Sequence, residues 1–231
     1  MTTIAGVEVH IEGLGENTVL MLHGWPDSHR LWDSTVAALQ DRWRCVRFTL
    51  PGFDRSRPRR GYSLDEVIGV IHAVADQVSP DRPVTLLLHD WGCVYGYQFA
   101  MREPARVARI VGVDIGDAGS RDHLRSLGPK AKAMVAFYQL WLVAAWRLSA
   151  VFGAGLGDRM TRFMARAIGH RGDPQHITVN ANYPYDMQWT GSFGSFKAMQ
   201  VFKPACPTLY LYGRRKPFMF HSQAWAETLA Q

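Results

Sequence analysis

Short apolar runs alternate with helical patterns along the first half of the chain. We expect strands at residues 6–11, 17–24, 44–50, 83–90 and 109–115, and helices at 30–40, 63–78 and 92–102. The helix after Ser63 is the best marked, because SLDE forms a capping box and apolar residues then recur at helical spacing. Strands and helices that alternate in this way predict an α/β fold with a mostly parallel sheet covered on both faces.

The pattern changes in the middle of the chain. We expect residues 1–116 to form the first part of a core, 117–203 a helical lid, and 204–231 the second part of the core, with a strand at 206–213 and a helix at 220–229. Residues 133–157 are apolar enough to suggest a membrane span, but Gln139 and Arg147 interrupt them. A lid helix over an apolar pocket is favoured, and peripheral membrane contact is the less favoured alternative.

Composition narrows the class of protein. A chain of 231 residues that is 47% hydrophobic can bury one sizeable core. The net charge is +6, but the densest basic cluster, residues 55–60, has no aromatic platform and is interpreted as a solvated loop, so no nucleic-acid partner is predicted. Three cysteines in or beside apolar runs favour free thiols, and the alternating N-terminus is typical of a strand rather than a signal peptide. We therefore expect a cytoplasmic protein without metal or cofactor.

Polar or glycine-bearing motifs follow the predicted strands. They are HGWP at 23–26, LPGFDRS at 50–56, HDWG at 89–92 and DIGD at 114–117. In open parallel sheets, ligands bind beyond the carboxyl ends of the strands, so these motifs mark the candidate site.

The three motifs HGWP, LPGFDRS and HDWG together resemble the α/β-hydrolase family, strongly over residues 4–116 and more weakly over 204–230. The resemblance implies that Asp90 is the nucleophile at a sharp strand-to-helix turn, with the backbone N–H groups of Trp25 and Trp91 as the oxyanion hole. An aspartate at this turn resembles epoxide hydrolases and haloalkane dehalogenases, which form a covalent ester. The alternative is that Asp90 only caps the following helix.

The resemblance also bears on the substrate, a small apolar electrophile. Epoxide hydrolases use lid tyrosines as proton donors, and Tyr138, Tyr183 and Tyr185 lie in the insertion, where any two could serve or all could simply pack. Haloalkane dehalogenases hold the halide with a tryptophan after the nucleophile, as Trp91 could, and often with an asparagine where this chain has Trp25. HGWP therefore favours an epoxide, with a haloalkane as the alternative.

Several positions depart from the family's pattern. Leu88 stands where the turn usually has a small residue, and Lys216 stands where an acid often follows the penultimate strand. That acid is then Asp114, with Asp117 as second choice, and the equal alternative is that Asp114 is a structural cap. No histidine fills the general-base motif, because the sequence stops before the strand and histidine that the family places last. We expect a truncated C-terminus that lacks the last strand and helix. A non-catalytic relative that binds apolar ligands is the alternative function, and no oligomeric state is predicted.

Overall fold

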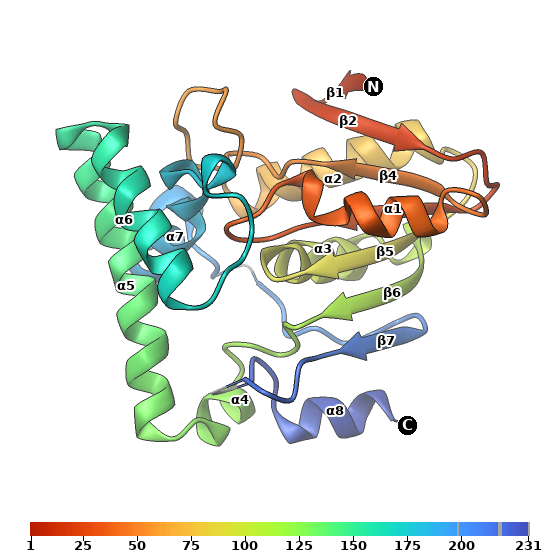
Figure 1. Cartoon of the computed structure of the whole chain (residues 1–231). Helices are drawn as coiled ribbons and strands as arrows, with labels where there is room; N and C mark the ends of the chain where they lie inside the picture. Colours follow the sequence, from red (N-terminus) through yellow and green to blue (C-terminus); the bar gives the residue numbers. More distant parts are fainter. Residues whose placement is uncertain (198, 217–218, 231) are drawn as a thin grey trace.

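A seven-stranded sheet forms the centre of the structure (Figure 1). The computed structural model describes residues 1–197, 199–216 and 219–230. In spatial order the strands are β1 (Thr2–Ile4), β2 (Val7–Glu12), β4 (Arg44–Phe48), β3 (Thr18–Leu22), β5 (Val84–His89), β6 (Val107–Val113) and β7 (Thr208–Leu211). The strands from β4 to β7 pair in parallel, whereas β2 pairs with β1 and β4 in antiparallel fashion. The predicted α/β fold with a mostly parallel sheet is confirmed.

Both faces of the sheet are buried, as the continuous apolar strands require. Alternate residues of β3 serve different cores: Leu20 and Leu22 pack in the cluster that includes helices α2 (Leu64–Val78) and α3 (Trp91–Arg102). Val19 and Met21 pack on the other face with Val36 of α1 (Asp33–Leu39). Figure 1 shows α1 on the near face of the sheet, with α2 and α3 behind it.

The predicted elements differ from the observed ones mainly at their ends. Helix α2 begins after Ser63, and its capping box is present, with Ser63 Oγ accepting from the Glu66 N–H and the Glu66 side chain accepting from the Ser63 N–H. The expected helix at 30–40 is divided into a 3₁₀ turn, η1 (His29–Trp32), and α1. Strand β1 was not predicted because its three residues are too short to show a pattern.

A layer of helices connects β6 to β7. Its elements are α4 (Arg121–Ser126), α5 (Pro129–Phe152), α6 (Ala154–Ala167), η3 (Pro174–His176), η4 (Val179–Asn182), α7 (Tyr183–Thr190) and η5 (Ser192–Gly194), and α8 (Gln223–Leu229) follows β7. The apolar stretch 133–157 is not one helix, because Gly153 adopts a φ of 88° and separates α5 from α6. Figure 1 shows α5, α6 and α7 beside the carboxyl ends of the parallel strands.

In the arginine-rich loop after β4, Arg55, Arg57 and Arg60 are exposed as predicted, whereas Arg59 packs against the helical layer. The Arg59 guanidinium lies 3.4 Å from the centroid of the Trp146 ring in α5 and donates a hydrogen bond to the Trp146 carbonyl. Arg55 lies 3.6 Å from the buried carboxylate of Asp158 in α6. The loop therefore anchors the helical layer to the core through one cation stacked on an aromatic ring and another paired with an acid.

Candidate active site

Asp90 lies at the bend between β5 and α3. Strand β5 ends at His89 and α3 begins at Trp91, so one residue makes the whole turn. Asp90 has φ 52° and ψ −121°, a conformation that costs a non-glycine residue about 1–3 kcal/mol. A side chain at Gly92 would place its Cβ 2.2 Å from the Leu22 carbonyl oxygen, so only glycine lets β3 and the start of α3 approach this closely. The turn thus holds the Asp90 side chain above the sheet.

Two backbone N–H groups point at the Asp90 carboxylate. The Trp25 N–H donates a hydrogen bond to Asp90 Oδ1 over 2.7 Å, and the Trp91 backbone N–H is near enough to the same carboxylate to lower its pKa. A Cβ on Gly24 would lie 2.2 Å from Oδ1, which explains the glycine before Trp25. The carboxylate makes no capping hydrogen bond to α3, so its geometry differs from that of an ordinary helix cap. The predicted nucleophile and both predicted oxyanion-hole donors are therefore adjacent.

The loop that carries Trp25 is fixed at both ends. The His23 ring accepts a hydrogen bond from the Leu50 N–H at Nε2 (2.9 Å), so Nδ1 carries the proton and donates to the Gly24 carbonyl (2.9 Å). Burial lowers the pKa of His23 to about 3, which keeps the ring neutral. His23 thus acts as a structural bridge between two of the loops that resemble family motifs.

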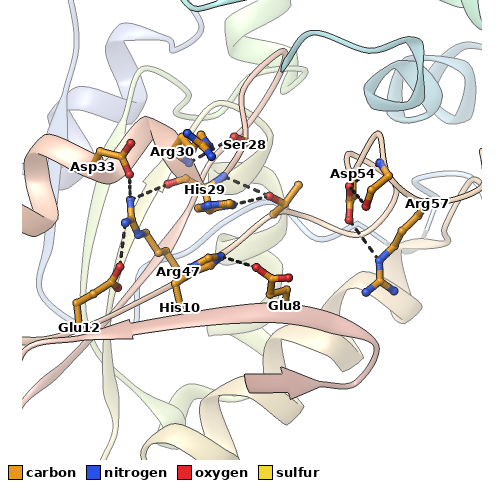
Figure 2. Close-up of polar contacts among 12 residues, drawn as sticks. Glu8, His10, Glu12, Ser28, His29, Arg30, Asp33, Arg47, Asp54 and Arg57 are labelled. Carbon is orange, nitrogen blue, oxygen red and sulfur yellow. Dashed lines mark hydrogen bonds and ion pairs between the residues drawn. The ribbon is translucent and has the colours of Figure 1, made fainter. Parts of the chain in front are cut away.

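A cation secures the far end of the same loop. Figure 2 shows Arg47 of β4 between Glu12 of β2 and Asp33 of α1, with a further hydrogen bond to the His29 carbonyl. Arg47 is almost fully buried, and a buried guanidinium requires such paired acceptors. The network ties the loop after β3 to two neighbouring strands and so holds the Trp25 N–H in place.

The carboxyl groups at the site lie in a desolvated environment. Burial raises the pKa of Asp90, although His89 and the two backbone N–H groups oppose the change. Asp90 keeps some accessible surface because it faces a cavity, while protein surrounds its other sides. Burial also raises the pKa of Asp27 to about 6, and the nearby Asp90 carboxylate contributes. Two carboxyl groups of raised pKa therefore lie close together.

Two adjoining cavities have Asp90, Tyr138, Tyr185 and Phe220 in their walls. The Trp91 cavity, about 560 Å³, is completed by Trp91, His123, Trp189 and Phe196 among others. The Trp25 cavity, about 580 Å³, is completed by residues that include Trp25, Asp114, His170, Lys216, Phe137 and Ile168. Both have mainly apolar walls, as expected for sites that bind apolar small molecules, and the Trp25 cavity also carries several acidic and basic side chains.

The three candidate tyrosines have different positions. Tyr138 and Tyr185 line both cavities, and their ring centroids are 6.1 Å apart. The Tyr138 hydroxyl accepts from Gln139 Nε2, which leaves its proton available to a ligand, and burial raises the pKa of both hydroxyls so that they stay protonated. Tyr183 is different: its hydroxyl donates to the Pro51 carbonyl over 3.0 Å, outside both cavities. The structure thus assigns Tyr183 to packing.

The two candidate orienting acids are also separated. Asp114 lines the Trp25 cavity with Asp90, and its carboxylate is paired with Lys216, the residue that departs from the family's pattern. Asp114 also has a φ of 82° at the end of β6. Asp117 accepts from the Ser120 hydroxyl and from the N–H and hydroxyl of Ser222, so it fixes the start of α8. Of the two, only Asp114 lies at the cavity.

Three described histidines line the cavities, and the sequence analysis singled out none of them as a base. His123 has both ring nitrogens engaged, with the Gly119 N–H and the Met219 carbonyl. His170 lies with Nε2 3.7 Å from Asp27 Oδ1, and His89 precedes Asp90 in the chain. His221 contacts the Tyr210 hydroxyl (3.0 Å) and lines neither cavity. The Asp27–His170 pair had no sequence signal, because 143 residues separate its members.

The geometry defines the class of protein, and sequence comparison agrees. The alpha/beta hydrolase fold family matches residues 17–169, about two thirds of the chain, so the protein belongs to that family.

The individual relatives that the chain resembles include epoxide hydrolases. The chain is 36% identical over 122 residues, 51% of its length, to "Probable oxidoreductase EphD" of Mycobacterium tuberculosis, and 30% identical over 105 residues, 44% of its length, to "Epoxide hydrolase 1" of Caenorhabditis elegans. The matched stretches cover 20% and 26% of these relatives, respectively. The crystal structure of an epoxide hydrolase from Bacillus megaterium with an inhibitor superposes with a TM-score of 0.66 at 18% identity, over 99% of this chain and 85% of that one. The likeness in structure concerns the fold.

Proposed function

We propose that this protein hydrolyses small apolar epoxides through an ester formed on Asp90. The observation that carries the proposal is the Asp90 carboxylate, held at a strained turn with the N–H groups of Trp25 and Trp91 on it and an apolar cavity before it. A carboxylate can displace at saturated carbon, whereas a serine at this turn is typical of acyl transfer. The relatives named as epoxide hydrolases support the same choice of substrate.

In the proposed reaction, each oxygen of Asp90 has its own role. Oδ2 attacks an epoxide carbon, the C–O bond of the ring breaks, and its electron pair goes to the ring oxygen, which takes a proton from Tyr138 or Tyr185. Oδ1, which accepts the Trp25 N–H, becomes the carbonyl oxygen of the ester. Water then adds to that carbonyl while the two N–H groups stabilise the negative charge on oxygen. The ester C–O bond breaks, the proton released from water returns to the tyrosinate, and the products are a diol and the free carboxylate.

A haloalkane is the second candidate substrate, and one observation favours it. The buried Trp91 Nε1–H has no hydrogen-bond acceptor among the described residues. Burial raises the pKa of the Tyr185 hydroxyl, and the nearby Trp91 Nε1–H offsets a small part of that rise. A halide leaving group would supply an acceptor. The second halide donor, an asparagine in haloalkane dehalogenases, is replaced by Trp25 in this chain. Trp25 Nε1 is already engaged, because it donates to Asn182 Oδ1 over 2.8 Å.

Covalent trapping tests the proposal. Incubation with excess styrene oxide, stopped by a rapid acid quench before the ester is hydrolysed, is expected to add one equivalent of the epoxide's mass to the protein, and peptide mapping is expected to place it on Asp90. A 1-chloroalkane of similar size should release chloride at less than about a tenth of the rate of epoxide opening if the epoxide is the better substrate.

The matched control is Asp114→Asn, which changes the other carboxylate of the Trp25 cavity. This variant should still form the ester, while Asp90→Asn should not. An Asp90 that stays unmodified in this quench while the epoxide binds and no diol is released would overturn the proposal in favour of a non-catalytic relative that binds apolar ligands.

The second half of the reaction is expected to depend on His170. Burial lowers its pKa and Asp27, whose pKa is about 6, lies 3.7 Å away, so at neutral pH an uncharged imidazole faces an ionised carboxylate in the cavity that holds Asp90. His170→Gln should therefore slow hydrolysis of the ester by about 10²–10⁴-fold while leaving its formation nearly unchanged. Rapid-quench mass spectrometry would show accumulated ester. Equal turnover by the variant would mean that another group activates water.

The cytoplasmic location and the role of the helical insertion as a lid stay predictions. Closure over bound substrate is expected to involve α5 and α7, because Tyr138 and Tyr185 lie on them.

A further inference from the structure

The outer faces of α5 and α6 form an exposed apolar surface. In α5, Phe137, Leu140, Leu148 and Val151 recur at spacings of three, eight and three residues, which keeps them on one side of the helix. Val151 is 76% exposed and Phe137 is 63% exposed, whereas the opposite side of α5 is buried. Scattered apolar residues on a surface need no explanation, but a continuous stripe along a helix marks an interaction site.

Aromatic contacts extend this stripe onto α6. The rings of Trp141 and Phe163 lie with centroids 5.4 Å apart, and Trp141 Nε1 donates to the Met160 carbonyl over 3.0 Å. Phe163 is 58% exposed, so the two helices share one apolar surface. We call it the α5–α6 face; its exposed members are Met134, Phe137, Leu140, Leu148, Val151, Phe152, Leu156, Phe163 and Ile168. Figure 1 shows α6 beside the carboxyl end of α5 at the edge of the molecule.

The charges around the face are almost all positive. Helices α5 and α6 contain six basic residues, Lys130, Lys132, Arg147, Arg159, Arg162 and Arg166, and one acid, Asp158. Arg162 and Arg147 are paired with Asp158 and Asp186. The other four have no ion-pair partner within the part of the chain that the structure describes. Arg159, Phe163 and Arg166 lie four and three residues apart, so two unpaired cations flank an exposed aromatic ring.

The face borders the mouth of the cavity that holds Asp90. Met134, Phe137 and Ile168 belong both to the α5–α6 face and to the wall of the Trp25 cavity. An apolar molecule in contact with this face could therefore enter the cavity without crossing water. Such continuity would serve substrates that partition into lipid.

We propose that the α5–α6 face docks on an anionic lipid bilayer, with α5 in the plane of the interface and the Trp25 cavity open toward the lipid. An exposed apolar stripe with unpaired basic residues beside it matches a membrane surface with anionic headgroups. A second copy of this chain is a poorer match, because four like charges would face four more.

The helix α5 does not need to span the bilayer. By length and composition it is the one helix of the described residues that could, with a mean hydropathy of 1.4, and 33% of its most apolar window is buried inside the protein. Its buried side contacts the rest of the fold through Leu142, Val143 and Trp146. A spanning helix would have to break those contacts, whereas an interfacial helix keeps them. Delivery of substrate from the bilayer to the cavity rests on the proposed epoxide hydrolysis, whereas the docking itself does not depend on that activity.

Vesicle flotation tests the docking. The full chain is expected to float with vesicles of phosphatidylcholine and 30% phosphatidylglycerol at low salt, and to bind pure phosphatidylcholine at least tenfold more weakly. Arg159→Gln should weaken binding about fivefold, as should Arg166→Gln, and added salt should reduce these differences. Phe163→Ser with Val151→Ser should weaken it tenfold or more, because two exposed apolar side chains no longer enter the interface.

Matched controls are taken from elsewhere on the surface. Leu14→Ser removes a fully exposed apolar side chain outside the face, and Arg42→Gln removes an exposed cation, so both should bind vesicles like the unchanged protein. No flotation with anionic vesicles, or equal losses in the controls, would overturn the proposal. A dimer that is detected by sedimentation velocity and dissociated by Phe163→Ser would also overturn the proposal. Opening of a water-soluble epoxide, measured without vesicles, separates failure of docking from failure of the proposed function.

Discussion

Replacing Asp90 with asparagine is expected to abolish epoxide hydrolysis, by roughly 10⁴-fold or more, while leaving the fold intact. The amide keeps an oxygen where Asp90 Oδ1 accepts the Trp25 N–H, so the hydrogen bond of 2.7 Å and the turn persist. What is lost is a carboxylate oxygen able to form the ester. Steady-state release of diol from styrene oxide measures the loss.

The same substitution is expected to stabilise the protein at neutral pH. Burial raises the pKa of Asp90, so its ionised form is less favourable in the folded chain than in the unfolded chain. A carboxyl group whose pKa is higher in the folded chain than in the unfolded chain makes the fold more stable as the pH falls through the folded pKa toward the unfolded pKa. This contribution to stability is lost when the pH rises above the folded pKa. The gain in unfolding free energy from Asp90→Asn should therefore be larger at pH 8 than at pH 4.5.

Chemical unfolding at the two pH values measures this difference. Asp27 also has a raised pKa, about 6, and the Asp90 carboxylate contributes to that rise, so its trend is weaker in the variant and adds to the same difference between variant and parent. A variant that is inactive and also less stable at pH 8 would show that Asp90 has a structural role instead. Loss of activity together with a gain in stability is the signature of a strained functional group.

The fold could be predicted from local patterns because the parallel strands are largely apolar: β3 is buried along its whole length, and β5 and β6 are buried or half-buried except at Arg109. The candidate site could be predicted where close packing demands a residue type. Gly24 and Gly92 are required because a Cβ at either would meet Asp90 or the Leu22 carbonyl at 2.2 Å, and such requirements leave a motif in the sequence.

Other parts of the site depend on contacts that leave no local pattern. Tyr183 and Tyr185 are two residues apart on α7, so their side chains point in different directions. The Tyr183 hydroxyl donates to the Pro51 carbonyl, whereas the Tyr185 side chain lines the cavities. The pairing of Asp114 with Lys216 spans 102 residues, and that of Asp27 with His170 spans 143. Sequence spacing alone could not have placed these groups together.

Leu88 departed from the family's pattern, and the structure shows how it is accommodated. Leu88 is fully buried, and a Cβ on Gly96 would lie 2.5 Å from Leu88 Cδ2. The absent side chain at Gly96 therefore makes room for the large one at Leu88. We expect Gly96→Ala to lower the free energy of unfolding by about 1–3 kcal/mol, because the leucine has no free space to move into, even though alanine is favoured in a helix.

A double-mutant cycle separates this explanation from a general intolerance of substitution in α3. Leu88→Ala alone should cost about 2–5 kcal/mol because it leaves a cavity. In that background the methyl group of Gly96→Ala enters the vacated space, so the second substitution should be neutral or stabilising, with a coupling of about 1–3 kcal/mol. Urea unfolding of the four proteins measures the cycle. If Gly96→Ala costs as much beside Ala as beside Leu at residue 88, the two positions are independent and the accommodation must lie elsewhere in the turn.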